Sequence, residues 1–598
     1  MRVALIGAEL EENLGLRYMA SSLESEGHET LIIPFNTQHD IAAAVDQVGR
    51  FDPSIAGLSM VFTSRAREFC SLAAALRDAG YAGHIIAGGH FAALNCQRLL
   101  EDFPAFDSVS LGEGEEIICA LARHLDDPSG VAGLCFRRAD GSIALNPSAG
   151  NPDRLDALPF PKRTEFHSYF GIPIASILSS RGCWRNCAFC SINAWYKSGG
   201  GKKFRIRSVG NIVAEMSQLY FEHGIRAFNF QDDNFFLPDP AQALARFEAL
   251  RDGLREAGVG RIAIAIKARP DSITRETVSV LDELGLFRVF LGVENASEHG
   301  LRGLNRLCTV QQVLDGLRIL NEFDVHIAYN LLMFEPDTTM DDILTNLHFM
   351  GQHIENPCNF CRAEAYAGTG LEEKLRAENR LLGDYFGFDY RIKDPRSEAF
   401  HQVANHAFFE RNFSDFGLHY FNMQVDFFYQ LLRRFYPEVL TQTVRAAVRN
   451  FIKRTNLDSY ECLAQIYDFV VRADPADPLM LHGFAREMRQ EVDRRSSLLF
   501  DDGERIIRWL TDLYERRGEE AAAPRAHPDG MPRPADSGLP SQQAGMMPYR
   551  GPQSLEEPEP AWAGTGRYAL PDLFGIAPEA IPYETFSKEL AQQQEEGR

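Results

Sequence analysis

The stretch from Arg181 to Cys190 reads RGCWRNCAFC and places three cysteines within eight residues, in the spacing CxxxCxxC. An apolar run over residues 174–178, Ile-Ala-Ser-Ile-Leu, comes shortly before it and predicts a buried strand. No fourth cysteine or histidine lies nearby in the sequence, because the next cysteine is Cys308. The pattern therefore predicts a loop at the end of a strand that presents three thiols together.

Three thiolates on one loop can hold three irons of a [4Fe-4S] cluster and leave the fourth iron open to a small molecule. A structural zinc site normally has four protein ligands, so a zinc knuckle fits this loop less well. Buried apolar cysteines without a metal are the remaining alternative. The metal ligands that we predict are Cys183, Cys187 and Cys190.

The composition indicates a protein of several domains, because 598 residues exceed one ordinary core. The formal charge of -22 argues against a nucleic-acid-binding protein, which usually needs a basic face. No apolar run approaches the roughly 20 residues of a membrane helix, and the start of the chain resembles a buried strand rather than a signal peptide. Apart from the three on the loop, the eleven cysteines are scattered. We therefore expect a protein of the reducing cytoplasm, without nucleic-acid or membrane partners.

Residues 1–125 alternate short apolar strands with helices, which predicts an α/β domain with a doubly wound, flavodoxin-like parallel sheet. Ligands of such sheets bind at the carboxyl ends of the strands, and glycines there let the backbone approach a large flat ligand. Those ends carry Gly57-Leu58-Ser59-Met60, Gly88-Gly89-His90 and Gly112-Glu113-Gly114-Glu115. Residues 126–168, with several prolines, are expected to form a connector.

Residues 169–370 repeat a strand–helix unit six times, which predicts an open (β/α)6 barrel with its site at the carboxyl ends of the strands. In the third strand Ile262, Ile264 and Ile266 share one face, which should meet the outer helices. Ala263, Ala265, Lys267 and Arg269 share the face toward the lumen. Polar residues alternate in the same way in other strands, so we expect a lumen wide enough to hold ligands. The six expected strands are 174–179, 227–231, 262–267, 288–293, 326–333 and 359–365.

The composition divides the rest of the chain into three segments. Residues 371–517 are helical and rich in aromatic residues, including the run 385–388, and should cap the open end of the barrel as a helical C-terminal domain. Residues 518–567 are rich in Ala, Pro, Gly and Ser and are expected to be disordered, and 568–598 form a C-terminal tail. The CxxC of Cys358 and Cys361 straddles the start of a strand and is interpreted as incidental.

The cysteine spacing, with Phe189 before the last cysteine, resembles that of the radical S-adenosylmethionine (SAM) superfamily. The stretch 12–18 and the GGH and GEGE motifs resemble the cobalamin-binding domain that precedes the barrel in the B12-dependent subclass, of the class B methyltransferase type. Many such domains carry DxHxxG, whose histidine ligates cobalt, but the loop 8–13 has no histidine. The resemblance thus implies cobalamin held without a histidine on its lower face. The alternative is a domain that binds nothing, or another nucleotide cofactor.

The resemblance also implies candidate binding residues. Here QDD at 231–233 replaces the more common GGE, which leaves open the residue that contacts the SAM amino group. For every charged candidate the alternative is a salt bridge that supports the barrel, and no side chain is assigned a catalytic role beyond the cofactors. The SAM-binding candidates are Phe189, Gln231, Asp233, Lys267, Arg269, Glu294 and Asn330. The cobalamin-binding candidates are Glu12, Leu14, Ser59, Met60, Gly88, Gly89, His90, Gly112, Glu113 and Gly114. The substrate-pocket candidates are Arg362, Glu364 and Tyr366.

The activity implied is methylation of an unactivated carbon, or of phosphorus, in a small-molecule or peptide substrate of natural-product biosynthesis. Cleavage of SAM at the reduced cluster would supply a 5′-deoxyadenosyl radical that takes a hydrogen from the substrate, and methylcobalamin would supply the methyl group. The electron donor would be a flavodoxin or ferredoxin. One alternative is a radical cyclisation or rearrangement without net methylation, and another is a cobalamin-binding sensor. A methylthiotransferase would need further cluster cysteines.

Overall fold

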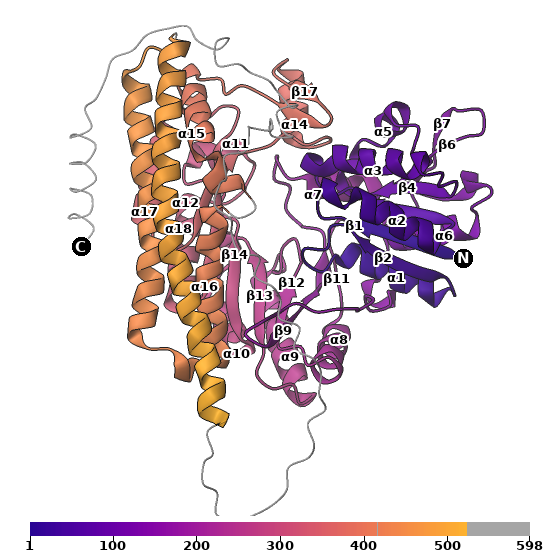
Figure 1. Ribbon diagram of the computed structural model, residues 1–598, viewed down its shortest axis with the longest axis horizontal. Coiled ribbons are helices and arrows are strands. Elements are labelled where there is room, and N and C mark those ends of the chain that lie inside the picture. Colours follow the sequence, from indigo (N-terminus) through magenta and orange to yellow (C-terminus); the bar gives the residue numbers. More distant parts are fainter. Residues whose placement is uncertain (415–416, 476, 523–598) are drawn as a thin grey trace, which may run out of the picture.

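The computed structural model describes residues 1–414, 417–475 and 477–522. An α/β domain at the N-terminal end, a central curved sheet and a long helical bundle follow one another across the molecule (Figure 1). The last helix, α18 (Pro478–Ala522), runs into the range expected to be disordered. The rest of that range and the tail 568–598 lie outside the described residues.

The N-terminal domain is built on a seven-stranded sheet of order β2-β1-β3-β4-β5-β6-β7, which confirms the doubly wound prediction. The first five strands pair in parallel, and β6 and β7 add an antiparallel edge from the range expected to be a connector. The strands are β1 (Arg2–Gly7), β2 (Glu29–Pro34), β3 (Ile55–Ser59), β4 (His84–Gly88), β5 (Ser108–Ser110), β6 (Leu134–Arg137) and β7 (Ile143–Leu145). The helices are α1 (Leu14–Ser25), α2 (Ile41–Phe51), α3 (Ala66–Asp78), α4 (His90–Leu94), α5 (Cys96–Asp102) and α6 (Gly114–Arg123).

The central sheet is an open half-barrel of order β16-β15-β14-β13-β12-β9-β8, and all six expected parallel strands are present. A short antiparallel strand, β8, extends its edge. The strands are β8 (Ser168–Tyr169), β9 (Ile172–Ile177), β12 (Ala227–Phe230), β13 (Ala263–Ala268), β14 (Leu286–Leu291), β15 (His326–Phe334) and β16 (Cys358–Arg362). The helices that follow them are α7 (Ser191–Gly199), α8 (Val209–Glu222), α9 (Pro240–Glu256), α10 (Arg275–Leu284), α11 (Glu298–Gly303), α12 (Val310–Glu322), α13 (Met340–Gln352) and α14 (Gly370–Ala377).

The two faces of β13 behave as their alternation predicts. Ile264 and Ile266 belong to the large core formed with the outer helices. Ala263 and Ala265 lie on the other face, in a small cluster with Leu431 of α16 (Leu418–Phe435). The aromatic helix α16 therefore covers the inner face of the half-barrel near the amino ends of the strands. It does not lie over the carboxyl ends, and the cap that the sequence predicted for residues 371–517 at the open end of the barrel stays a prediction.

The other helices of the C-terminal region pack around α16 and the outer side of the sheet (Figure 1). They are α15 (Pro395–Phe413), α17 (Gln442–Arg472) and α18. None of the described helices is long and apolar enough to span a membrane.

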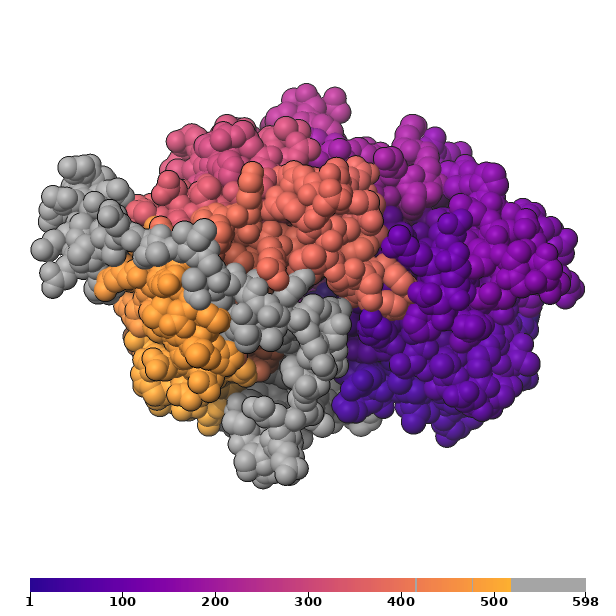
Figure 2. Space-filling model, turned by 90° about the horizontal axis from the view of Figure 1, so that it is seen from above, coloured from indigo at the N-terminus to yellow at the C-terminus, as the bar shows by residue number. Residues whose placement is uncertain are grey.

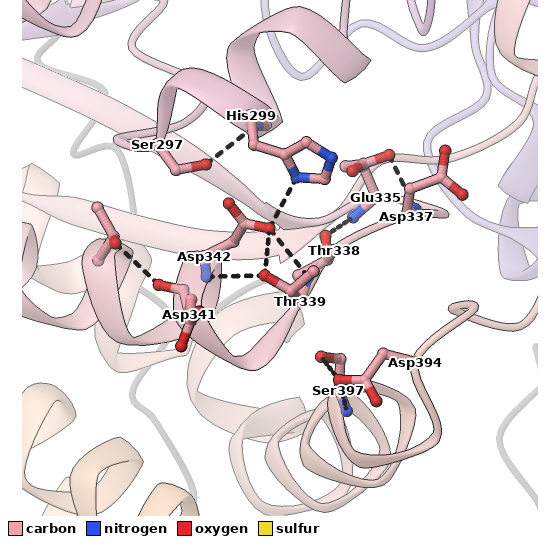
Figure 3. A network of polar contacts seen from close by, with 12 residues as sticks. Ser297, His299, Glu335, Asp337, Thr338, Thr339, Asp341, Asp342, Asp394 and Ser397 are labelled. Atoms are coloured by element: carbon pink, nitrogen blue, oxygen red, sulfur yellow. Dashed lines mark hydrogen bonds and ion pairs between the residues drawn. The ribbon is translucent and has the colours of Figure 1, made fainter.

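A capping box fixes the start of α13, the helix that follows β15. The Asp342 carboxylate accepts hydrogen bonds from Thr339 N (2.9 Å) and Thr339 Oγ1 (2.7 Å), and the Thr339 hydroxyl accepts one from Asp342 N. His299, on α11, lies 2.8 Å from the same carboxylate (Figure 3). The loop after β15 is thereby tied to its neighbour α11.

A hairpin from the C-terminal region reaches back to the N-terminal domain. Strands β17 (Leu382–Asp384) and β18 (Gly387–Asp389) lie beside its helices, as Figures 1 and 2 show. The Tyr385 hydroxyl donates a hydrogen bond to Asp102 (2.6 Å), and Phe386 packs in the core of that domain. The aromatic run 385–388 thus fastens the C-terminal region to the N-terminal domain.

Two buried ionic clusters join the N-terminal domain to the half-barrel. In the first, which we call the GEGE clamp, Arg181 pairs with Glu113 (3.0 Å) and Glu115 (2.6 Å). Arg205 also binds Glu113 (3.0 Å). The side chains of Glu113 and Arg205 are 3% and 2% exposed. The clamp is balanced in charge, with two carboxylates facing two guanidinium groups.

The second cluster forms around Glu12. Its carboxylate accepts a hydrogen bond from Ser176 N (2.6 Å) on β9 and pairs with Arg163 (2.9 Å). Arg163 also binds Glu215 of α8 (2.8 Å), which in turn pairs with Arg207 (2.6 Å). Glu12, a cobalamin candidate from the sequence, is thus placed as a structural link between domains.

Replacing Glu113 with Gln should destabilise the protein by about 3 kcal/mol, because removing one partner strands buried guanidinium charge. Urea unfolding followed by circular dichroism measures the loss. The matched control is Glu116→Gln, since Glu116 is exposed on the same helix. An equal midpoint for both variants would show that the clamp does not hold the domains.

Candidate active site

The cysteine loop leaves the sheet after β9 and is held at its base by the end of β12. The Asp232 carboxylate accepts hydrogen bonds from Ser179 N (2.9 Å), Ser179 Oγ (2.6 Å) and Ser180 Oγ (2.5 Å). Gly182 has φ 81°, and a Cβ there would overlap the carbonyl oxygen of Lys203. Only glycine fits this turn, so the backbone before Cys183 has one available path.

Two arginines face the middle cysteine. Arg306 Nη1 lies 3.3 Å and Arg269 Nη1 lies 3.5 Å from Cys187 Sγ. Arg269 is oriented by Asp271 (2.9 Å) and by the carbonyl oxygen of Arg306 (2.6 Å). The sequence predicted Arg269 as a contact to the SAM carboxylate. In the structure its guanidinium contacts Cys187 of the cysteine loop. Arg306 was missed, because it lies in a loop that no strand alternation marks.

The three thiols lie within electrostatic reach of one another and fit a cluster. Burial raises the pKa of Cys183 and, to about 12, that of Cys190, and the charge of Cys187 adds to both effects. No three His, Cys, Asp or Glu side chains among the described residues are grouped to hold a single metal ion. A cluster differs in taking each thiolate on a separate iron. The cationic surroundings of Cys187 also suit an anionic cluster.

A cavity of about 290 Å³ lies where the strand ends of the N-terminal domain face the half-barrel, and we call it the interdomain cavity. It brings together residues that the sequence assigned to two different cofactors. Lining residues from the cobalamin set are Ser59, Gly88, Gly89, His90, Gly112, Glu113 and Gly114, and those from the SAM set are Gln231 and Asp233. Leu14 and Met60 are instead buried in the domain.

Helix α7, directly after the cysteines, contributes Trp195 and Tyr196 to the same cavity. The rings of His90 and Trp195 lie 4.5 Å apart, edge to face. Burial lowers the pKa of His90 to about 4, so its imidazole is neutral at pH 7. Sequence reasoning missed the aromatic pair on α7, although its position after the cysteine loop was a usable signal.

The glycines of the cavity have distinct structural reasons. Gly89 has φ 94°, and a Cβ there would lie 2.9 Å from the carbonyl oxygen of Met60. Gly112 has φ 82°, and its Cβ would lie 2.8 Å from Gly199 Cα at the end of α7. Gly112 thus allows the two domains to approach as well as leaving its edge of the cavity open.

The three residues of the QDD run, 231–233, make different contacts. Asp232 supports the loop, whereas Gln231 and Asp233 face the interdomain cavity. Asp233 accepts a hydrogen bond from Gly182 N (3.1 Å), and burial raises its pKa to about 6, opposed by Lys267. Gln231 donates to Glu11 (3.1 Å) and accepts from Lys267 Nζ (3.4 Å). At pH 7 Asp233 remains mostly a carboxylate.

Glu294 lies in a tight cradle beside the cysteine loop. Its backbone is left-handed, with φ 65°, and its carboxylate lies 3.8 Å from Arg306 Nη2. A Cβ on Gly292 would lie 2.9 Å from that carboxylate, so glycine makes room for it. The carbonyl oxygen of Asn330 accepts from Glu294 N (3.1 Å), which places Asn330 alongside. Phe189 packs partly buried against the barrel core.

The substrate-pocket candidates from the sixth strand make local contacts instead. Arg362 pairs with Asp389 (2.6 Å), and the Tyr366 hydroxyl donates to Glu364. None of the three lines the interdomain cavity.

Burial raises the pKa of Cys358 to about 12 and also raises that of Cys361, as expected of unreactive thiols.

Comparison with known families accounts for both halves of this site. Residues 177–350 match the Radical SAM superfamily, and residues 7–122 match the B12 binding domain. The chain therefore combines a radical SAM domain with a B12-binding domain. The cofactors of this enzyme are therefore a [4Fe-4S] cluster, SAM and cobalamin. The described residues fit them, with three thiols for the cluster and a glycine-edged cavity for the corrin.

Relatives of the enzyme include an uncharacterized methyltransferase, PH0819, of Pyrococcus horikoshii, 26% identical over 62% of this chain and 79% of that one. The hopanoid C-3 methylase of Methylococcus capsulatus is 26% identical over 64% of this chain and 71% of that one. An anaerobic magnesium-protoporphyrin IX monomethyl ester cyclase of Cereibacter sphaeroides is 26% identical over 51% of this chain and 50% of that one.

Solved structures share the fold. The cobalamin-dependent SAM radical enzyme OxsB matches with a TM-score of 0.62 and 15% identity, over 87% of this chain and 84% of that one. The radical SAM methyltransferase TsrM of Kitasatospora setae matches with a TM-score of 0.54 and 17% identity, over 64% of this chain and 78% of that one.

Changing Cys187 to Ala should abolish retention of the cluster, since two thiolates cannot hold it. Iron and sulfide analysis after anaerobic reconstitution measures this. Cys361→Ala is the matched control and should retain iron like the unchanged enzyme, because Cys361 is a partly buried cysteine outside the cysteine loop. Iron retained by Cys187→Ala at the level of the unchanged enzyme would refute Cys187 as a ligand. Absence of iron from the unchanged enzyme itself would favour a sensor without a cluster.

Proposed function

We propose that this enzyme moves a methyl group from SAM, by way of cobalamin, to an unactivated carbon or phosphorus atom of a small-molecule or peptide substrate. One observation carries the proposal: a single cavity is lined by the strand ends of the B12-binding domain and by Asp233 next to the cysteine loop. Bound together, the cluster, SAM and cobalamin supply hydrogen abstraction and a methyl donor.

The residues would divide the work as follows. The Asp233 carboxylate would bind the SAM amino group, and Glu294 and Asn330 would contact the nucleoside beside it. Lys267, with Gln231 as its partner, would be the cation available to the SAM carboxylate, because Arg269 is already engaged. Arg269 and Arg306 would hold Cys187 and offset negative charge on the cluster.

The N-terminal cavity edge would hold the corrin by its glycines. His90 is neutral and packs on Trp195. It would therefore limit the space for the corrin ring and would contribute no charge. Glu113 is already paired with two arginines, so its role would be to hold the GEGE clamp together. The buried clamp also screens the cavity from water, which a radical reaction requires.

A second function is favoured by the likeness to the magnesium-protoporphyrin cyclase, namely radical cyclisation without net methylation. The name of the Pyrococcus relative and that of the hopanoid methylase favour methylation. We propose a flavodoxin or ferredoxin as the electron donor. We also propose a reducing cytoplasmic setting, since every cysteine of the chain, all within the described residues, is free.

Replacing Asp233 with Asn should weaken SAM binding by about tenfold or more, through loss of one charge-assisted hydrogen bond. Equilibrium dialysis of labelled SAM against the reconstituted enzyme measures the affinity. Asp252→Asn, at an exposed position on α9, is the control and should bind SAM normally. Equal affinity in the two variants would remove Asp233 from the SAM site.

The reaction itself is tested by anaerobic incubation with SAM labelled in its methyl group, a reductant, cobalamin and candidate extracts. We expect 5′-deoxyadenosine and a product that has gained one labelled methyl group. The Cys187→Ala enzyme, run in parallel, should yield neither. Deoxyadenosine together with an unlabelled product would support the cyclisation instead.

A further inference from the structure

A second cavity, of about 160 Å³, lies inside the half-barrel, and we call it the lumen cavity. It is bounded by the inner faces of four strands, by α16 and by the loop before α1. Residues from those strands include Ser176, Asn229, Ala265 and Arg288. Since α16 covers this face from the amino ends of the strands, the lumen cavity lies deeper in the half-barrel than the cysteine loop.

Aromatic side chains form one part of the wall of the lumen cavity. Tyr169 packs on Phe427 and Phe428 with ring centroids 5.6 Å and 5.5 Å apart, and Phe287 packs on Phe427 at 5.4 Å. A cavity of about 150 Å³ lined by apolar side chains accepts one benzene ring. The lumen cavity is therefore sized for a single ring or a short branched chain.

Polar side chains complete the lining, among them the carboxylates of Glu11 and Glu12 and one guanidinium, that of Arg288. The guanidinium of Arg288 lies 5.6 Å from the centre of the Phe427 ring, and its Nε has no hydrogen-bond partner. No ion pair of 4.0 Å or less joins it to a carboxylate of the described residues. Glu11 of the same cavity and Asp426 act on it from farther away, and Asp426 already pairs with His326 (2.9 Å) and Arg449 (3.5 Å). Desolvation of a cation that lacks a partner costs free energy, so the position is poorly suited to a purely structural role.

The lumen cavity connects to the cofactor region through one polar contact. Glu11 lines the lumen cavity, Gln231 lines the interdomain cavity, and the Gln231 side chain donates to Glu11 at 3.1 Å. Lys267 binds the other side of the same amide. A molecule seated in the lumen cavity would therefore extend its free end toward Gln231 and the cysteine loop.

We propose that the lumen cavity binds the tail of the substrate, and that this tail is a single ring or short apolar group carrying an oxyanion that pairs with Arg288. The planar guanidinium fork matches a carboxylate or phosphonate in two parallel hydrogen bonds. The aromatic walls hold the apolar part, and the reacting atom lies toward Gln231. This inference rests on the proposed function in taking the half-barrel lumen as the substrate site.

The test uses the full chain with its cofactors but without reductant, so that no turnover occurs. Calorimetric titration compares three probes: 3-phenylpropionate, 2-phenylethylphosphonate and the neutral 3-phenylpropionamide. We expect at least one of the two anions to bind about tenfold or more tightly than the amide. Whichever anion binds better identifies the oxyanion. Equal affinity for all three, or no binding, would overturn the proposal.

Variants separate binding from folding. Arg288→Met should remove the preference for the anions while leaving the melting temperature unchanged or higher, because a half-buried charge without a close partner is lost. Arg288→Lys should restore part of the preference. Arg255→Gln, on the exposed face of α9, is the control and should change neither. A lower melting temperature in Arg288→Met with the preference intact would indicate a structural arginine.

Failure here is distinguishable from failure of the proposed methyl transfer. The titration needs no radical chemistry, so an enzyme that cleaves SAM and methylates a neutral substrate would fail only this test. An enzyme that binds the anions but transfers no methyl group would fail only the other.

Discussion

The structure depends on the burial of the GEGE clamp between two domains. Arg181 is followed at once by the glycine turn and the first cysteine, so the ion pairs with Glu113 and Glu115 fix the cysteine loop against the N-terminal domain. A buried charge cluster tolerates little displacement, because each group depends on its partner. The distance between the cluster site and the corrin cavity is therefore set by ion pairs that themselves lie at the wall of that cavity.

Helix α16 closes the half-barrel from the amino ends of its strands. In a packed barrel the branched side chains of the strands fill the interior. Here alanines and polar residues face inward, and α16 supplies the missing volume with its aromatic side chains. What remains is a lumen with a hydrophobic floor, one cation and a polar passage to the cofactor region. The helix rather than the strands thus shapes the space available to a substrate.

Much of the fold was readable from sequence, because strand alternation is local. The inner and outer faces of β13 follow from the period of two within the strand, and the half-barrel and the doubly wound sheet follow from the succession of apolar strands and helices. The partners of charged residues were not readable. Glu113 and Arg205 lie 92 residues apart, and only the folded chain shows that they pair. Residue type alone likewise did not show that Arg269 contacts Cys187 and Asp271, and its contact with SAM stays a prediction.

The contact of the β17–β18 hairpin with the N-terminal domain has a consequence for synthesis on the ribosome. Tyr385 and its partner Asp102 are 283 residues apart, so the N-terminal domain emerges long before the segment that covers Phe91 and Phe103. At typical translation rates that interval lasts roughly 15 to 60 s. During it the nascent domain carries an uncovered apolar patch, which makes it a natural client for a chaperone that binds early and leaves late.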